Sequence, residues 1–205
     1  MIVIVDYDMG NVGSIANMLK KIGVDSVITS DPKQIEAAEK LILPGVGAFD
    51  TGMTNLDRSG LLAVLNEKVV DRKTPVLGIC LGMELLTQGS EEGICPGLGW
   101  IDGRTVRFRF PDGAGQLNVP HMGWNGVRPA PQGVLMRDLP AENRFYFVHS
   151  FYVACDRDED VGGWTRYGSE FASVVERGNV MGTQFHPEKS HRFGMALLRN
   201  FAAFH

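Results

Sequence analysis

The chain has 205 residues, of which 44% are hydrophobic and 21% are charged, and its formal net charge is -4. This composition predicts one folded globular domain over residues 1–205, and the mild acidity offers no basic surface for nucleic acid. No apolar run approaches the roughly 18 residues that cross a membrane, and Met1–Val5 runs directly into Asp6 without the regions of a secretory signal.

The chain contains three cysteines, Cys80, Cys95 and Cys155, which lie far apart and form no Cys-x-x-Cys pair. An odd number of separated cysteines predicts neither a disulfide framework nor a zinc site. We therefore expect a protein of the reducing cytoplasm that holds no metal.

Short β-branched segments alternate with amphipathic segments through the first half of the chain. Strands are predicted at Ile2–Val5, Ser26–Thr29, Lys40–Leu43 and Pro75–Ile79. Helices are predicted from an N-cap at Ser14 to Gly23, from Asp31 to Ala38, and over Leu61–Val70. This alternation favours an α/β fold, a three-layer sandwich in which helices cover both faces of a central, mostly parallel sheet.

The second half of the chain predicts additional antiparallel strands, separated by Gly- and Pro-rich turns. These strands are expected at Arg104–Phe110, Asn118–Arg128, Phe145–Val153 and Ser173–Gln184. The last of them contains a hairpin signal at Gly178-Asn179. A closing helix is predicted at about His191–Phe204, because its apolar side chains recur on one face.

A candidate nucleophile stands in Gly78-Ile79-Cys80-Leu81-Gly82, between a predicted strand and the helix-like Met83–Leu86. A sharp strand-to-helix turn needs glycine where its backbone segments meet, and it presents the central side chain. At a helix N-terminus the dipole favours the Cys80 thiolate, and the N–H of Leu81 can hold an oxyanion. A lone cysteine is more often a small core residue, but this context favours a nucleophile.

A candidate base follows in His186-Pro187-Glu188, directly after a strand that ends at Gln184-Phe185. Pro187 favours extended backbone at His186, where residues two apart point the same way. Glu188 can therefore hold the tautomer of the imidazole and stabilise the imidazolium, which is the orienting role in a catalytic triad. His149 is the strongest rival base, but no acid lies two residues away from it.

The segment Pro44-Gly45-Val46-Gly47 ends the third predicted strand and is flexible enough to aim a backbone N–H at the nucleophile. It completes neither a dinucleotide fingerprint nor a P-loop, so we do not expect it to bind a nucleotide. Together with the cysteine turn and His186-Pro187-Glu188, this loop resembles the class I glutamine amidotransferases. The resemblance implies an oxyanion hole formed by Val46, Gly47 and Leu81, and a glutamine contact at Gly45.

The resemblance covers almost the whole chain and is most specific for the glutaminase subunits of imidazole glycerol phosphate synthases. It rests on Asp6-Tyr7 with Gly10-Asn11, and on Val119–Asn125, Phe145–Ser150 and His186–Ser190. It implies a flavodoxin-like fold, L-glutamine as the substrate, a Cys80-His186-Glu188 triad and no cofactor. It also implies a heterodimer in histidine biosynthesis, in which a (β/α)8-barrel cyclase receives ammonia and faces Asn11, His121, Trp124 and Asn125.

One position departs from the pattern of this family, which usually has glutamine four residues after the nucleophile, where this chain has Glu84. One helical turn beyond Cys80, Glu84 is expected to face the same pocket and bind substrate, although an ordinary solvated charge is the alternative. A carboxylate accepts but does not donate, so it would hold an ammonium or amide N–H and repel a carboxylate.

Two other functions stay open on the sequence. Glu84 and the segment Cys95–Trp100 leave room for a paralogous subunit that supplies ammonia for surface-polysaccharide amidino-sugar synthesis. From a different class, the chain could be a catalytically silent binding subunit that keeps only the fold. The intact Cys80, His186 and Glu188 argue against silence.

Overall fold

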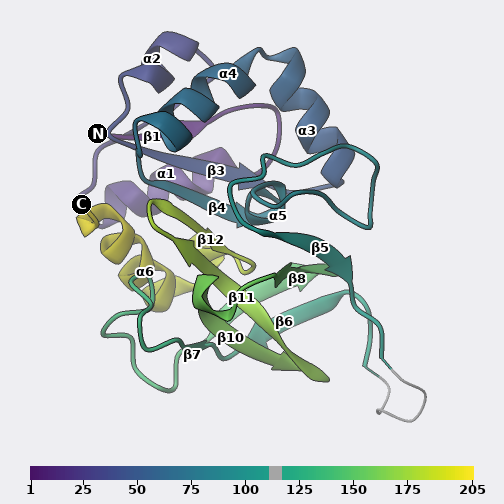
Figure 1. The fold of residues 1–205 in the computed structure, drawn as a ribbon. Helices are drawn as coiled ribbons and strands as arrows, with labels where there is room; N and C mark the ends of the chain where they lie inside the picture. Colours follow the sequence, from purple (N-terminus) through teal and green to yellow (C-terminus); the bar gives the residue numbers. More distant parts are fainter. Residues whose placement is uncertain (111–116) are drawn as a thin grey trace.

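A computed structural model describes residues 1–110 and 117–205 of the chain (Figure 1). Its parallel strands are β1 (Ile2–Val5), β2 (Ser26–Thr29), β3 (Lys40–Gly45), β4 (Val76–Cys80) and β12 (Val180–Thr183). They lie in the order β2-β1-β3-β4-β12 and run in one direction, so that their carboxyl ends meet at one edge of the sheet. Binding sites of α/β proteins form at that edge.

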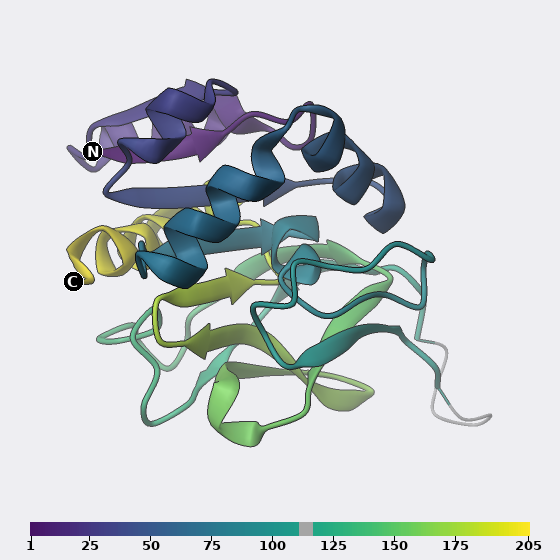
Figure 2. The ribbon, with the colours of Figure 1, turned by 45° about the horizontal axis from the view of Figure 1, so that its top comes forward.

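Helices cover both faces of this sheet (Figures 1 and 2). One face carries α1 (Val12–Lys21) and α6 (His191–Ala203), and the other carries α2 (Pro32–Glu36), α3 (Phe49–Arg58) and α4 (Leu61–Asn66), which continues into a π-helical turn at Glu67–Asp71. Alternate residues of β1 divide the core, because Val3 packs toward α2–α4 and Ile4 toward α1 and α6. The predicted three-layer α/β sandwich is confirmed.

Antiparallel strands extend the sheet beyond β12. They are β11 (Ser169–Arg177), β10 (Val161–Tyr167) and β7 (Arg128–Pro129), with β9 (Phe151–Cys155) and β5 (Gly103–Arg107) branching from β11. The strands β6 (His121–Asn125) and β8 (Phe145–His149) form a separate antiparallel pair. The predicted hairpin is confirmed, since Arg177 pairs with Val180 and Gly178 has a φ of 58°.

Several boundaries differ from the expectation. Asn11, not Ser14, caps α1, because its Oδ1 accepts the Ser14 N–H at 3.1 Å. The expected strand Phe145–Val153 is two strands in different sheets, β8 and β9, because the chain bends at Ser150. Helix α3 and strand β10 were not predicted, since α3 is rich in polar residues and contains Gly52, and β10 begins Val161-Gly-Gly.

The described parts of the chain are residues 1–110 and 117–205. None of their helices has both the length and the apolar character that a membrane span requires. Their His, Cys, Asp and Glu side chains form no group of three or more that could hold a metal ion.

Candidate active site

Cys80 stands on a strained turn between β4 and α5 (Leu81–Leu85). Its φ is 54°, a left-handed backbone that residues other than glycine rarely adopt. The flanking glycines make the turn possible: a Cβ at Gly78 would lie 2.7 Å from the carbonyl carbon of Gly82, and one at Gly82 would lie 1.8 Å from the Leu43 oxygen. The predicted strand-to-helix turn around Cys80 is confirmed, with the close approaches that its glycines implied.

Gly45 is a third glycine that supports this turn. It pairs with Cys80 in the register of β3 and β4 and is buried. A Cβ at Gly45 would lie 2.8 Å from the backbone nitrogen of Gly82. The structure therefore places Gly45 beneath the turn as a packing residue, rather than in the wall of the cavity that Cys80 opens into.

The proposed base and its orienting acid are in contact. Nδ1 of His186 lies 2.7 Å from Oε1 of Glu188, and both side chains are almost fully buried. The backbone N–H of His186 donates to the backbone carbonyl of Tyr146 at 2.9 Å, which connects this residue to β8. A carboxylate accepts, so the proton of a neutral imidazole sits on Nδ1; Nε2, buried and without a hydrogen-bond partner among the described residues, is left to act as the base.

One cavity of about 450 Å³ joins these groups at the carboxyl edge of the parallel strands. Its lining includes Cys80, Leu81, Glu84 and His186. Val46 and Gly47, the predicted oxyanion loop, line it as well, and the Val46 side chain is exposed. The sequence predicted these residues on three separate segments of the chain, and the structure brings the three to one cavity.

The charge state of Cys80 differs from the expectation. Burial raises the pKa of the Cys80 thiol, the nearby Glu84 and Glu188 carboxyls raise it further, and the N–H of Leu81 that bonds to the sulfur only partly opposes them. The predicted effect of the helix N-terminus is present, since the Leu81 N–H lowers the pKa of the thiol, but burial outweighs it in the free chain. Desolvation outweighs the dipole because α5 is short and the thiol is almost completely removed from water.

Glu84 faces the cavity, as its position one turn after Cys80 predicted, but it is not a solvated charge. Its side chain is 5% exposed, and Oε1 accepts a hydrogen bond of 2.8 Å from Nε2 of Gln184. Burial raises the pKa of Glu84 to about 8, although the bond from Gln184 opposes that rise. Gln184 was not predicted as a site residue; its place two residues before His186 in a buried strand end was the available signal.

The rival base His149 also lines the cavity, but both of its ring nitrogens are engaged. Nδ1 lies 2.6 Å from the Phe151 carbonyl oxygen, and Nε2 lies 2.9 Å from Nδ1 of His121. Burial lowers the pKa of His149 to about 3 and that of His121 to about 4. Neither imidazole has a free ring nitrogen for the Cys80 proton, whereas Nε2 of His186 has no hydrogen-bond partner among the described residues.

The residues expected to face a partner behave differently from one another. Trp124 is 48% exposed on β6 and stacks on His191, with ring centroids 5.5 Å apart. Asn125 is half-buried and bonds to the Arg166 carbonyl, while Asn11 is exposed as the cap of α1. His121 contradicts the expectation of a surface residue: it is 3% exposed because it points inward to His149.

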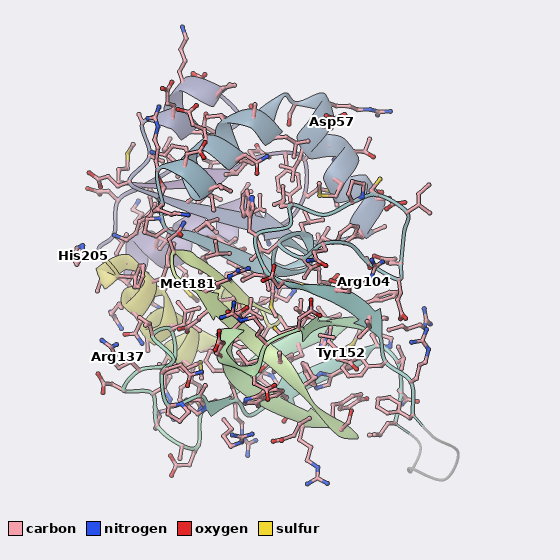
Figure 3. All side chains as sticks on the ribbon, viewed as in Figure 1. Asp57, Arg104, Arg137, Tyr152, Met181 and His205 are labelled. Atoms are coloured by element: carbon pink, nitrogen blue, oxygen red, sulfur yellow. The ribbon has the colours of Figure 1, made fainter. Side chains whose placement is uncertain are left out.

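A larger cavity, of about 740 Å³, lies at the amino ends of the parallel strands, opposite Cys80. Its wall includes Lys73, Trp100, Arg177 and His205. Figure 3 labels His205, which follows α6. None of the chain's three cysteines and neither member of the His186-Glu188 pair lines the larger cavity, whereas Cys80 and His186 both line the smaller cavity.

Comparisons with known proteins agree with this geometry. Residues 3–203 match the family described as glutamine amidotransferase class-I. The chain is 55% identical to imidazole glycerol phosphate synthase subunit HisH 2 of Methanococcus maripaludis and 50% identical to the subunit of the same name in Pseudomonas aeruginosa, each over 98% of both chains. The chain therefore belongs to the class I glutamine amidotransferases.

Solved structures support the same fold at lower identity. A crystal structure of a glutamine amidotransferase is 20% identical, with a TM-score of 0.72 over 97% of this chain and 96% of that chain. The structure of PurLQS from Thermotoga maritima is 18% identical, with a TM-score of 0.72 over 98% and 96%. Within the family, the relatives from Methanococcus maripaludis and Pseudomonas aeruginosa, at 55% and 50% identity, are both HisH subunits.

Proposed function

We propose that this chain is the glutaminase subunit of an imidazole glycerol phosphate synthase, which hydrolyses L-glutamine and passes ammonia to a (β/α)8-barrel cyclase in histidine biosynthesis. The observation that carries the proposal is the single cavity shared by Cys80, His186 and Leu81. Residues 1–205 act as one amidotransferase domain, since β12 near the chain's end pairs with β4. Three free cysteines support a cytoplasmic setting.

In the proposed reaction, Nε2 of His186 takes the proton of Cys80 as the sulfur attacks the side-chain amide carbon of glutamine. The N–H groups of Leu81 and of the Val46-Gly47 loop hold the negative oxygen of the tetrahedral intermediate. Protonated His186, stabilised by Glu188, then gives its proton to the departing ammonia. Water, activated by the same imidazole, hydrolyses the glutamyl thioester to glutamate and restores the thiol.

The raised pKa of Cys80 determines when its proton is transferred. Because the free chain keeps a buried thiol rather than a thiolate, proton transfer to His186 must accompany attack on the substrate. The exposed Val46-Gly47 loop is the part of the oxyanion hole that is not fixed by packing. A partner that closes this loop would raise the rate only when ammonia has somewhere to go.

Trp124 supports a partner surface close to the base. Trp124 pairs across the strands with Tyr146, and Tyr146 bridges to His186. Met122, on the same side of β6, is 62% exposed, so two large apolar side chains stand together in solvent. A surface of this kind is typical of an interface hot spot, and it connects the partner to the base through one strand pair.

The test compares glutamine hydrolysis by the chain alone, with the cyclase, and with the cyclase and its ligand. We expect slow hydrolysis alone and a strong rise in the full complex. Trp124→Ala should weaken the complex about tenfold or more in calorimetric titration, as hot-spot residues do. Val70→Ala is the matched control, since Val70 is 45% exposed but lines the cavity at the other end of the strands. A fully active lone chain, or undiminished binding by folded Trp124→Ala, would contradict the proposal.

A second candidate is a paralogous subunit that supplies ammonia for surface-polysaccharide amidino-sugar synthesis. It is favoured by Glu84, which stands where the family usually has glutamine. Both candidates share the glutaminase chemistry and differ only in the barrel partner. Titration against each barrel subunit of the same organism decides between them, whereas absent hydrolysis with every partner would indicate a catalytically silent binding subunit.

A further inference from the structure

Glu84 is a nearly buried carboxyl in the cavity of Cys80, and its surroundings disfavour a charge. It is 5% exposed, it lines the cavity of the nucleophile, and its hydrogen-bond partner is the neutral amide of Gln184. Within residues 1–110 and 117–205, no Lys, Arg or His forms an ion pair with it. A carboxylate removed from water without a cation is strongly disfavoured relative to the neutral acid.

We propose that Glu84 binds glutamine as a neutral carboxylic acid, a hydrogen-bond donor toward the substrate, with Gln184 as the residue that positions it. The inference rests on the proposed function, because it names how that cavity recognises its substrate. The amide of Gln184 donates to Oε1, so the proton of the acid is carried by Oε2. A neutral acid then offers one donor and one acceptor, the same pair that a glutamine side chain offers.

The groups around Glu84 favour this state on balance. Burial is the largest contribution to its raised pKa, and the carboxyl of Glu92 adds to it. The cation of the cavity, Arg107, is exposed and lies over the ring of Phe151, 5.6 Å from its centroid, where solvent screens its charge. The titratable and charged side chains that share the cavity with Glu84 are Cys80, Glu92, Arg107, His149 and His186.

A neutral and a charged Glu84 predict opposite pH dependences of glutamine binding. A carboxylate would hold the α-ammonium of glutamine, so ionisation would tighten binding. A neutral acid loses its donor and gains a charge on ionisation, so glutamine binding weakens as the pH rises through about 8. Glu84→Gln keeps the donor and the acceptor at every pH, which makes it the matched variant. A carboxylic acid kept neutral by an apolar site donates hydrogen bonds in this way in other enzymes.

The test measures KM for L-glutamine in the full complex at pH 6.5 and pH 9, for the unmodified chain and for Glu84→Gln. The ratio of the two KM values removes titrations that both share. We expect values within about threefold at pH 6.5 and a KM about tenfold higher for the unmodified chain at pH 9, because about nine-tenths of Glu84 is then ionised. A ratio that stays constant, or a Glu84→Gln variant tenfold weaker at pH 6.5, would overturn the donor role.

An infrared difference spectrum between the two proteins tests the charge state without turnover. A carboxylic acid band from Glu84 at pH 6.5 that disappears at pH 9 supports the proposal, and its absence at pH 6.5 overturns it. Failure of the proposed function is a separate result: the complex would show no glutaminase activity at any pH, while the infrared band would still decide the state of Glu84.

Discussion

The two sides of the cavity around Cys80 are in different states of readiness. On one side, His186 and Glu188 are already joined at 2.7 Å and buried. On the other side, Cys80 is held in place by the backbone, but burial raises the pKa of its thiol and the Val46-Gly47 loop is exposed. Folding of the chain alone thus completes the proposed base, whereas it fixes only the position of the proposed nucleophile. Substrate and partner would supply the remaining step.

On the side of His186 and Glu188, we expect replacement of the Glu188 carboxyl by an amide to lower the glutaminase rate strongly. Glu188→Gln keeps the shape of the side chain but no longer stabilises the imidazolium of His186. We expect kcat in the complex to fall by roughly 10³ to 10⁴, as with other triad acids, and the unfolding midpoint to change little. Glutaminase rates and thermal unfolding of Glu188→Gln check this. Activity within tenfold of the unmodified complex would show that Glu188 does not orient the base.

On the Cys80 side, we expect a change to the backbone of the turn, rather than a change of charge, to remove stability and activity. A Cβ at Gly82 would lie 1.8 Å from the Leu43 oxygen, so β3 and the turn must separate. Gly82→Ala should cost about 3 kcal/mol or more in urea unfolding and abolish hydrolysis. Gly13→Ala is the control, since, among the described residues, an added Cβ there would meet nothing within 4 Å apart from the backbone of its own helix, and alanine favours a helix. Equal stability of the two variants would contradict the account of the turn.

Glu84 should make the stability of the chain fall with rising pH. Its pKa is about 8 in the fold against 4.5 ordinarily, so the carboxyl is protonated in both states below 4.5 and costs nothing there. Between these values the unfolded chain releases the proton first, and the free energy of unfolding should fall by about 1.4 kcal/mol per pH unit. Glu84→Gln lacks this loss. Urea unfolding at pH 5, 6.5 and 8 should show a growing advantage for the variant; parallel profiles would indicate an ionised Glu84.

Local sequence patterns predicted the positions of the site residues but not their ionisation. Cys80, His186 and Glu188 were predictable because short-range patterns carry them: glycines around a turn, and an acid two residues after a histidine in extended chain. The ionisation of Cys80 and Glu84 was not predictable, because it depends on burial by strands and loops remote in sequence. Gln184 and the inward turn of His121 toward His149 have the same origin, since both result from long-range pairing.

The boundaries of the parallel strands were predicted more accurately than those of the strands in the second half of the chain. The parallel strands were predicted with small errors because strands buried on both faces are continuous β-branched runs. In the second half, β8 and β9 merged in the expectation, because nothing in the apolar run Phe145–Val153 marks the change of sheet at Ser150. Strand β10 was missed because its glycines hide it, although Gly163 packs against Val127 and Val174. Local pattern therefore locates the site better than it locates the sheet around it.

Of the three free cysteines, Cys80 alone is the proposed nucleophile toward glutamine. Burial raises the pKa of Cys80 and of Cys155, and also that of Cys95, so thiol acidity does not single out Cys80. Its distinction is the cavity it shares with His186. An electrophilic glutamine analogue, followed by mass-spectrometric mapping, should therefore label Cys80 and leave Cys95 and Cys155 unmodified, and His186→Ala should suppress the labelling. Equal labelling of the three cysteines, or full glutaminase activity in Cys80→Ala, would contradict the account.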